Sequence, residues 1–166
     1  MKLAMDTDAM VKLTKAGAKE PVSRAHEILL APAVQREAID QGKAGGHGDA
    51  LLIEQNVWGG RVAVRAGRRL AQAESLLASM QLSPGEEDAL RLYLTARADV
   101  VVSDDFDFLR KLRSLQVPML TPAALLLDMV QEGALTKAEG LRLLEQLSPH
   151  IADEEYFVAR SSMEAR

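Results

Sequence analysis

The sequence contains no cysteine and only three histidines. Without cysteine the chain cannot form a disulfide, a thiolate metal site or a cysteine nucleophile, which is compatible with a reducing compartment. Three histidines leave little from which to build a histidine-rich zinc site or a Ser-His-Asp triad. If the protein binds a metal ion, we therefore expect its ligands to be oxygen atoms.

Long apolar runs and an excess of basic residues are also missing. No segment approaches the roughly 20 apolar residues of a membrane-spanning helix, and the amino terminus lacks the basic-then-apolar order of a signal peptide. The net charge of −4 provides no overall attraction to nucleic acid, although basic patches can coexist with an acidic total. We therefore expect a cytoplasmic protein with no membrane partner.

The sequence does contain short apolar segments that alternate with helical patterns. A chain of this size can bury roughly 70% of its unfolded surface, so we expect one domain that spans residues 1–166. We predict five strands: Lys2–Met5, Glu27–Leu30, Arg61–Arg65, Asp99–Ser103 and Val117–Leu120. This alternation indicates an α/β fold, a three-layer α/β/α sandwich around a central parallel sheet, with residues 121–166 as a helical C-terminal extension.

Capping residues mark the expected helix starts, since Asp, Ser and Thr side chains bond to free backbone N–H groups and proline is harmless in the first turn. We predict helix starts at these residues: Asp8, Pro32, Asp49, Ser83, Thr121 and Thr136. Further helical patterns cover residues 50–58, 68–80 and 105–115.

The segment "VVVSDDFDF", residues 100–108, places three carboxylates directly after a buried strand. Carboxylates that share a small site raise one another's pKa and cost free energy unless a cation or hydrogen bonds compensate. Asp6 also follows a predicted strand, and neighbouring parallel strands end at one edge of a sheet. Glu37 and the group at residues 86–88 lie on helices that could reach the same edge. Such oxygen ligands suit Mg²⁺ or Mn²⁺.

Four motifs together resemble the PIN-domain family of metal-dependent ribonucleases: "MDTDAMVKL", "PAVQREA", "GEEDALRLYLTA" and "VVVSDDFDFLRKL". In that family, an Asp ends the first strand and a Glu lies on the helix after the second strand. A third acid lies before an Ala on a middle helix, and a fourth follows a Thr or Ser on the fourth strand by two residues. The residues that match here are Asp6, Glu37, Asp88 and Asp105.

The resemblance implies hydrolysis of RNA phosphodiester bonds with one or two Mg²⁺ or Mn²⁺ ions, which bridge the scissile phosphate and activate water. Asp6, Asp88 and Asp105 would be metal ligands, and Glu37 would be a ligand or would orient the water. Asp107 stands at an accessory position that is often acidic in relatives. Asp104 adds a carboxylate where many relatives have a neutral residue, so it stays open whether Asp104 or Asp105 faces the metal.

Basic residues gather in two segments that could contact RNA phosphates, residues 61–69 and 110–113. We assign substrate binding to Arg65, Arg68 and Arg69 in the denser segment. A homodimer is a second expected partner. If the protein is a non-catalytic binding module, Leu125, Leu126, Leu127 and Met129 could supply an oligomer interface. The helical extension resembles stand-alone family members more than short toxins, but a toxin-like role with an antitoxin partner stays open.

Two other functions are compatible with the residues. "MDTDAM" is similar to the Asp-x-Asp motif of haloacid-dehalogenase-like phosphatases, in which Asp6 would be the nucleophile. That class needs a lysine shortly before the late acids, and none occurs between Lys43 and Lys111. The second alternative is a non-catalytic module that binds RNA or protein and uses its acids, such as Asp104 and Glu86, only to cap helices.

Overall fold

The computed structural model describes residues 1–36, 39, 42–44, 46, 51, 54 and 62–165. Five parallel strands form one sheet in the order β3-β2-β1-β4-β5. Their bounds are β1 Lys2–Met5, β2 Glu27–Leu30, β3 Val62–Val64, β4 Val100–Val102 and β5 Met119–Leu120. All five predicted strands are present, and the parallel sheet with its covering helices confirms the predicted fold class.

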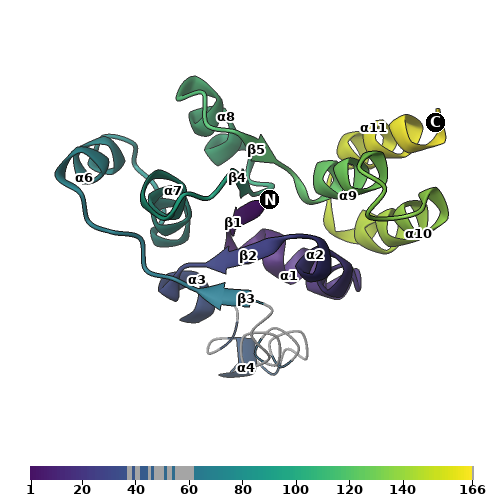
Figure 1. Cartoon of the computed structure of the whole chain (residues 1–166), viewed down its shortest axis with the longest axis horizontal. Helices are drawn as coiled ribbons and strands as arrows, with labels where there is room; N and C mark the ends of the chain where they lie inside the picture. The colour runs from purple at the N-terminus through teal and green to yellow at the C-terminus, as the bar shows by residue number, and fades with distance from the viewer. Residues whose placement is uncertain are drawn as a thin grey trace.

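The helices of the described part of the chain are α1 Thr7–Lys15, α2 Lys19–Ala25, α3 Pro32–Gln35, α4 Gly42–Ala44, α6 Ala71–Ala78, α7 Pro84–Ala96, α8 Phe106–Ser114, α9 Pro122–Gln131, α10 Lys137–Leu147 and α11 Asp153–Glu164, with a short 3₁₀ helix at Ser148–His150. Figure 1 shows α6, α7 and α8 on one side of the sheet and α1, α2 and the C-terminal helices on the other. None of these helices is long and apolar enough to span a membrane.

The centre of the sheet forms the core. Leu3, Ala4 and Met5 of β1 are fully buried, as are Val101 and Val102 of β4. A parallel strand covered on both faces is expected to be apolar at every position, which explains the run of three valines. On the helices that cover the sheet, buried residues such as Leu13 of α1 and Leu90 of α7 belong to the same core.

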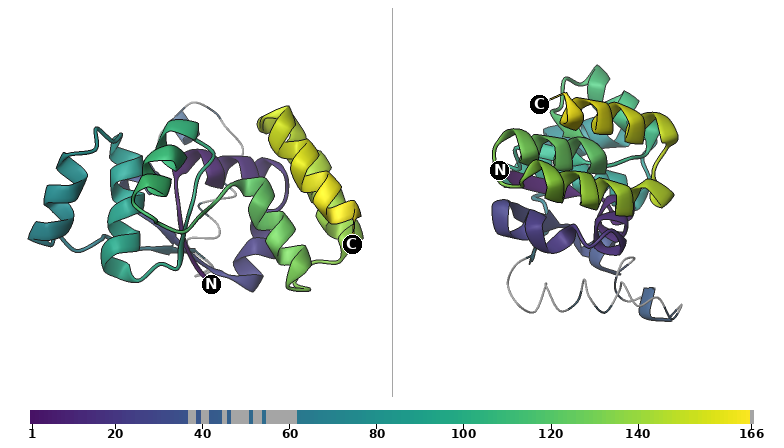
Figure 2. Two further views of the ribbon diagram at one scale, coloured as in Figure 1. Left: turned by 90° about the horizontal axis from the view of Figure 1, so that it is seen from above. Right: turned by 90° about the vertical axis from the view of Figure 1, so that its right-hand side faces the viewer.

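The residues after Thr121 are helical, and α9, α10 and α11 pack against one another, as Figure 2 shows in its right-hand view. Helices α9 and α10 also contact α1. Leu125, Leu126 and Met129 of α9 are fully buried in the core, so the expectation that they could form an oligomer interface is wrong. Gly140 allows the close approach of α10 to α9, because a Cβ atom there would lie 2.3 Å from Cγ2 of Val130. The assignment of residues 121–166 to an extension of a single domain stays a prediction.

The order in which strands are added to the sheet reverses between β1 and β4. From β1 the chain builds outward to β2 and β3, and it then returns to the other side of β1 to form β4 and β5. Open α/β sheets bind ligands outside the carboxyl ends of the strands at such a switch point. Met5 pairs with Val102 in the register, so Asp6 and Ser103 follow the two central strands side by side.

Candidate functional site

A cavity of about 260 Å³ lies at this switch point, and its lining residues are Asp6, Thr7, Asp8, Ser83, Gly85, Glu86 and Asp105. Each of them is the N-cap or lies in the first turn of α1, α7 or α8. The first turn of a helix has unpaired N–H groups and a partial positive charge, which favour negatively charged groups. Three helix N-termini therefore offset the carboxylates in this cavity and make it suitable for a phosphate.

Asp6 is the N-cap of α1 and is 7% exposed, with its Oδ1 accepting a 2.8 Å hydrogen bond from the N–H of Ala9. The pKa of the Asp6 carboxyl is raised to about 6, mainly by burial and to a smaller extent by the charges of Asp104 and Asp8, whereas hydrogen bonds from Ser103 and Ala9 oppose this rise. Desolvation is thus a larger cause than the repulsion between carboxylates that the sequence suggested. The prediction that Asp8 caps this helix is wrong, because Asp8 lies two positions after the N-cap, in the first turn of α1.

Ser103 joins the two strand ends. It is fully buried, and the hydrogen bond of its side chain with Asp6 lowers the pKa of that carboxyl. The same Oγ accepts a 3.1 Å hydrogen bond from the backbone N–H of Asp105. A hydroxyl group can donate one hydrogen bond and accept others, so Ser103 can hold both acidic residues in place. The sequence pattern contained this serine, but it was not among the predicted site residues.

Asp105 is the N-cap of α8, and its Oδ1 accepts a 2.7 Å hydrogen bond from the N–H of Phe108. Asp104 does not line the cavity. Its side chain is 9% exposed and forms an ion pair with the ammonium group of Lys12 on α1. Lys12 therefore compensates the charge of Asp104, whereas Asp105 is stabilised by the N–H of Phe108. Asp104 still lies close enough to Asp6 for its charge to raise the pKa of that carboxyl.

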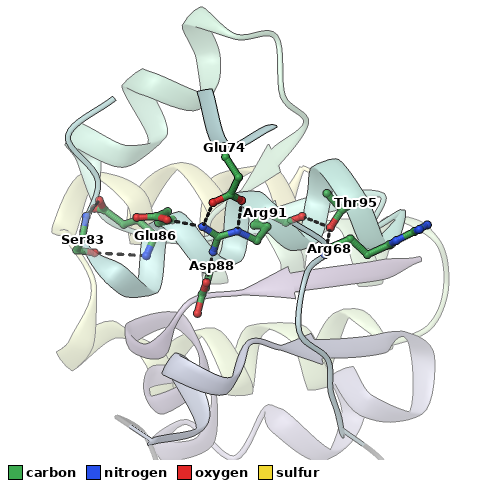
Figure 3. A network of polar contacts seen from close by, with 8 residues as sticks. Arg68, Glu74, Ser83, Glu86, Asp88, Arg91 and Thr95 are labelled. Atoms are coloured by element: carbon green, nitrogen blue, oxygen red, sulfur yellow. Dashed lines mark hydrogen bonds and ion pairs between the residues drawn. The ribbon is translucent and has the colours of Figure 1, made fainter. Parts of the chain in front are cut away.

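Asp88 points into a different network, shown in Figure 3. Its Oδ1 pairs with Nη1 of Arg91, and the same guanidinium binds the carboxylates of Glu74 and Glu87. The Arg91 side chain is only 6% exposed, and hydrogen bonding to Glu74 raises the pKa of Arg91 above its usual value. The structure therefore does not bring Asp88 to the cavity that contains Asp6.

Glu86 takes the place in the cavity that the sequence had assigned to Asp88. Its Oε2 accepts a 2.8 Å hydrogen bond from the N–H of Ser83, and Ser83 Oγ accepts one from the N–H of Glu86. This capping box agrees with the interpretation of Glu86 as a capping residue. Glu86 also lines the cavity, and the sequence signal for this was its position in the first turn of a helix that starts at the edge of the sheet.

The other predicted site residues lie outside the cavity or outside the described residues. Glu37 is not among the described residues. Asp107 is exposed and pairs with Arg110 at 3.0 Å. Three exposed arginines, Arg65, Arg68 and Arg69, follow β3, and the one strand β2 separates β3 from the β1 strand that precedes Asp6. The N–H of Arg68 donates to the Thr95 hydroxyl (Figure 3).

The oxygen atoms of the cavity fit a hard divalent cation. Among the residues that the structure describes, no group of three or more His, Asp or Glu side chains could hold a metal ion. Mg²⁺, however, commonly uses one or two carboxylates and completes its shell with water and substrate phosphate. Asp6 and Asp105 supply two carboxylates in a cavity where helix N-termini also favour a phosphate. The residues present therefore fit Mg²⁺ or Mn²⁺.

Comparison with known proteins adds one finding. A family model described as a PIN domain matches residues 2–164, and so covers every strand from β1 to β5 and every helix from α1 to α11. Searches of curated proteins and of solved structures found no match.

Proposed function

The chain belongs to the PIN-domain family, and on this basis we propose that it is a nuclease that uses Mg²⁺ or Mn²⁺ to hydrolyse phosphodiester bonds in RNA. PIN domains are generally nucleases that depend on divalent metal ions. The observation that carries the proposal for this chain is the cavity at the switch point, which Asp6 and Asp105 line together with the N-termini of three helices.

Asp6 and Asp105 would hold the metal ion in this proposal. When bound, Mg²⁺ or Mn²⁺ supplies Lewis-acid polarisation of the phosphate and a nucleophile from water at neutral pH. Ser103 keeps the two carboxylates in register by bonding to the side chain of one and the backbone of the other. Asp104 is paired with Lys12, so it is not assigned as a ligand in this proposal.

The chain itself would position the phosphate. The first turns of α1, α7 and α8 direct partial positive charge toward the cavity, and a phosphodiester has negatively charged oxygens that match it. Thr7 and Gly85 bring backbone groups to the lining without adding negative charge. Glu37 as a ligand or a water-orienting residue, and Arg65, Arg68 and Arg69 as phosphate contacts, stay predictions. Asp88 pairs with Arg91 and Asp107 pairs with Arg110, both outside the cavity, so neither is a ligand in this proposal.

Calorimetric titration with Mn²⁺ tests the site. We expect saturable binding by the parent protein, a large loss of affinity in Asp6→Asn and Asp105→Asn, and parent affinity in Asp107→Asn, because the side chain of Asp107 is 69% exposed outside the cavity. Cleavage of a labelled single-stranded RNA should follow the same order and stop in EDTA. A protein that binds no Mn²⁺ but still binds RNA would instead be the non-catalytic module considered above.

Several finer features stay predictions alongside this proposal. These are a homodimer, a protein inhibitor of the antitoxin kind, a toxin-like role and a cytoplasmic location. Sedimentation equilibrium would test the homodimer directly. Family membership removes the reason to consider Asp6 as the nucleophile of a haloacid-dehalogenase-like phosphatase.

A further inference from the structure

A second cavity, of about 360 Å³, lies between α8, β5 and the start of α9. Phe106, Arg110 and Arg113 of α8 form one wall, and apolar residues of β5 and α9 form the other. None of the described residues that line it is acidic. The cavity is therefore apolar with a basic wall, in contrast to the acidic cavity that Asp105 lines.

The side chain of Phe106 is exposed to solvent and does not pack in the core. It is 77% exposed, whereas Phe108, two positions later on the same helix, is fully buried in the core. Exposed aromatic side chains of this size commonly serve binding, since their flat faces are available for stacking and lose water on contact. Phe106 directly follows Asp105, so the two residues share the N-terminal end of α8, where Asp105 lines the first cavity and Phe106 lines the second.

Phe106, Arg110 and Arg113 lie at positions i, i+4 and i+7, which align along one face of a helix. With a rise of about 1.5 Å per residue, this stripe is about 10 Å long. Arg110 pairs with Asp107, but both side chains are about 70% exposed, and such exposed pairs contribute little and exchange readily. Both arginines can therefore turn toward an anionic ligand in the cavity.

We infer that this stripe is a subsite for single-stranded RNA, in which a nucleobase stacks on Phe106 while Arg110 and Arg113 contact the adjoining phosphates. The inference rests on the proposed function, because it seats the substrate beside Asp105. An aromatic platform combined with basic residues along the backbone is how proteins bind single strands without reading sequence. The basic wall complements phosphate, and the apolar lining accepts a base.

The test measures the affinity of a labelled single-stranded RNA in EDTA by fluorescence anisotropy, so that no cleavage occurs. Stacking of one base typically contributes enough that Phe106→Ala should weaken binding by about 5- to 150-fold. Phe106→Trp should keep parent affinity because it keeps the ring. Phe157→Ala is the matched control, since Phe157 on α11 is also exposed, at 61%, and does not line the cavity.

A second measurement identifies the base as the partner of Phe106. We expect an RNA with one abasic nucleotide at the stacking position to bind the parent as weakly as the intact RNA binds Phe106→Ala, and the two losses should not add. Arg113→Ala should lower the slope of log affinity against log salt by about 0.7, the value for one lost single-strand phosphate contact. Arg142→Ala, which changes an exposed residue of α10 outside the cavity, should leave the slope unchanged.

The outcomes separate this inference from the proposed function. If the parent binds and cuts RNA but Phe106→Ala does so equally well, the subsite is wrong and the nuclease stands. If the parent neither binds nor cuts RNA, both fail. The subsite is also wrong if RNA affinity is unchanged in Phe106→Ala while binding of an acidic, leucine-rich peptide or self-association is lost, because the cavity would then be a protein-docking surface.

Discussion

Replacing Asp6 by Asn should stabilise the metal-free protein. Burial raises the pKa of Asp6 from 3.8 to about 6. Since one pKa unit corresponds to about 1.36 kcal/mol, ionised Asp6 costs the folded state about 3 kcal/mol at pH 7.5. Asn caps a helix about as well as Asp, so the bond from Ala9 can be kept, but the loss of charge at the helix N-terminus removes about 0.3–1 kcal/mol.

The expected net gain is about 2 kcal/mol, which for a chain of this length raises Tm by roughly 4–8 °C. The folded-state pKa lies above the unfolded value, so the cost of ionisation is absent below pH 3.8, grows as the pH rises, and is complete above about pH 6. The two proteins should therefore have similar stability near pH 4 and differ most at pH 7.5.

Metal should reverse this order. A cation that binds only the folded state stabilises it by about 2.7 kcal/mol at one hundred times Kd, and Asp6→Asn should lose most of that gain. The assay is thermal unfolding in EDTA and in excess Mn²⁺ between pH 4 and 8, with Asp107→Asn as the exposed control. Our explanation fails if Asp6→Asn is less stable than the parent in EDTA at pH 7.5, or if the difference does not change with pH.

Three further predictions concern the surroundings of the site. Lys12→Met leaves the buried Asp104 carboxylate without its partner and should cost about 1–3 kcal/mol in EDTA melts, since a buried charge is expensive when unpaired; an unchanged melt would show that solvent already screens it. Gly67→Ala would place a Cβ 2.6 Å from Cγ of Arg91, and such overpacking should cost about 1–3 kcal/mol by urea unfolding; parent stability would refute the close approach. Replacing all three arginines of residues 65–69 by Ala should lower the salt slope of RNA binding by about 0.7 per lost contact; an unchanged slope would place the phosphate contacts elsewhere.

The sheet could be predicted from the sequence because its signals are local. β1 and β2 have the predicted bounds, since each is a short apolar run that ends at a helix start. Three helices of the described residues were missed, α2, the short α4 and α11, and of these α2 and α11 begin after an alanine that makes no side-chain capping bond. Neither start has a polar cap, and the remaining signal, acidic residues in the first turn such as Asp153, Glu154 and Glu155 of α11, was not used.

The direction of individual carboxylates could not be predicted. Successive residues of a helix are about 100° apart, so Glu86 and Asp88 face different sides although they are two positions apart. Asp88 pairs with Arg91 within its own helix and shares that arginine with Glu74, which comes from α6. The pair of Lys12 with Asp104 joins residues 92 positions apart, so it depends on the topology of the whole sheet.

The most direct test of the central claim, that Asp105 holds a catalytic metal ion, is the metal preference of Asp105→Cys. The chain has no cysteine of its own, so the new thiol would be unique. Thiolates prefer soft ions, whereas carboxylates suit Mg²⁺. RNA cleavage by Asp105→Cys should be lost in Mg²⁺ and return in Cd²⁺, while the parent and Asp107→Asn cleave in Mg²⁺. Cleavage by Asp105→Cys at the parent rate in Mg²⁺ would contradict the claim.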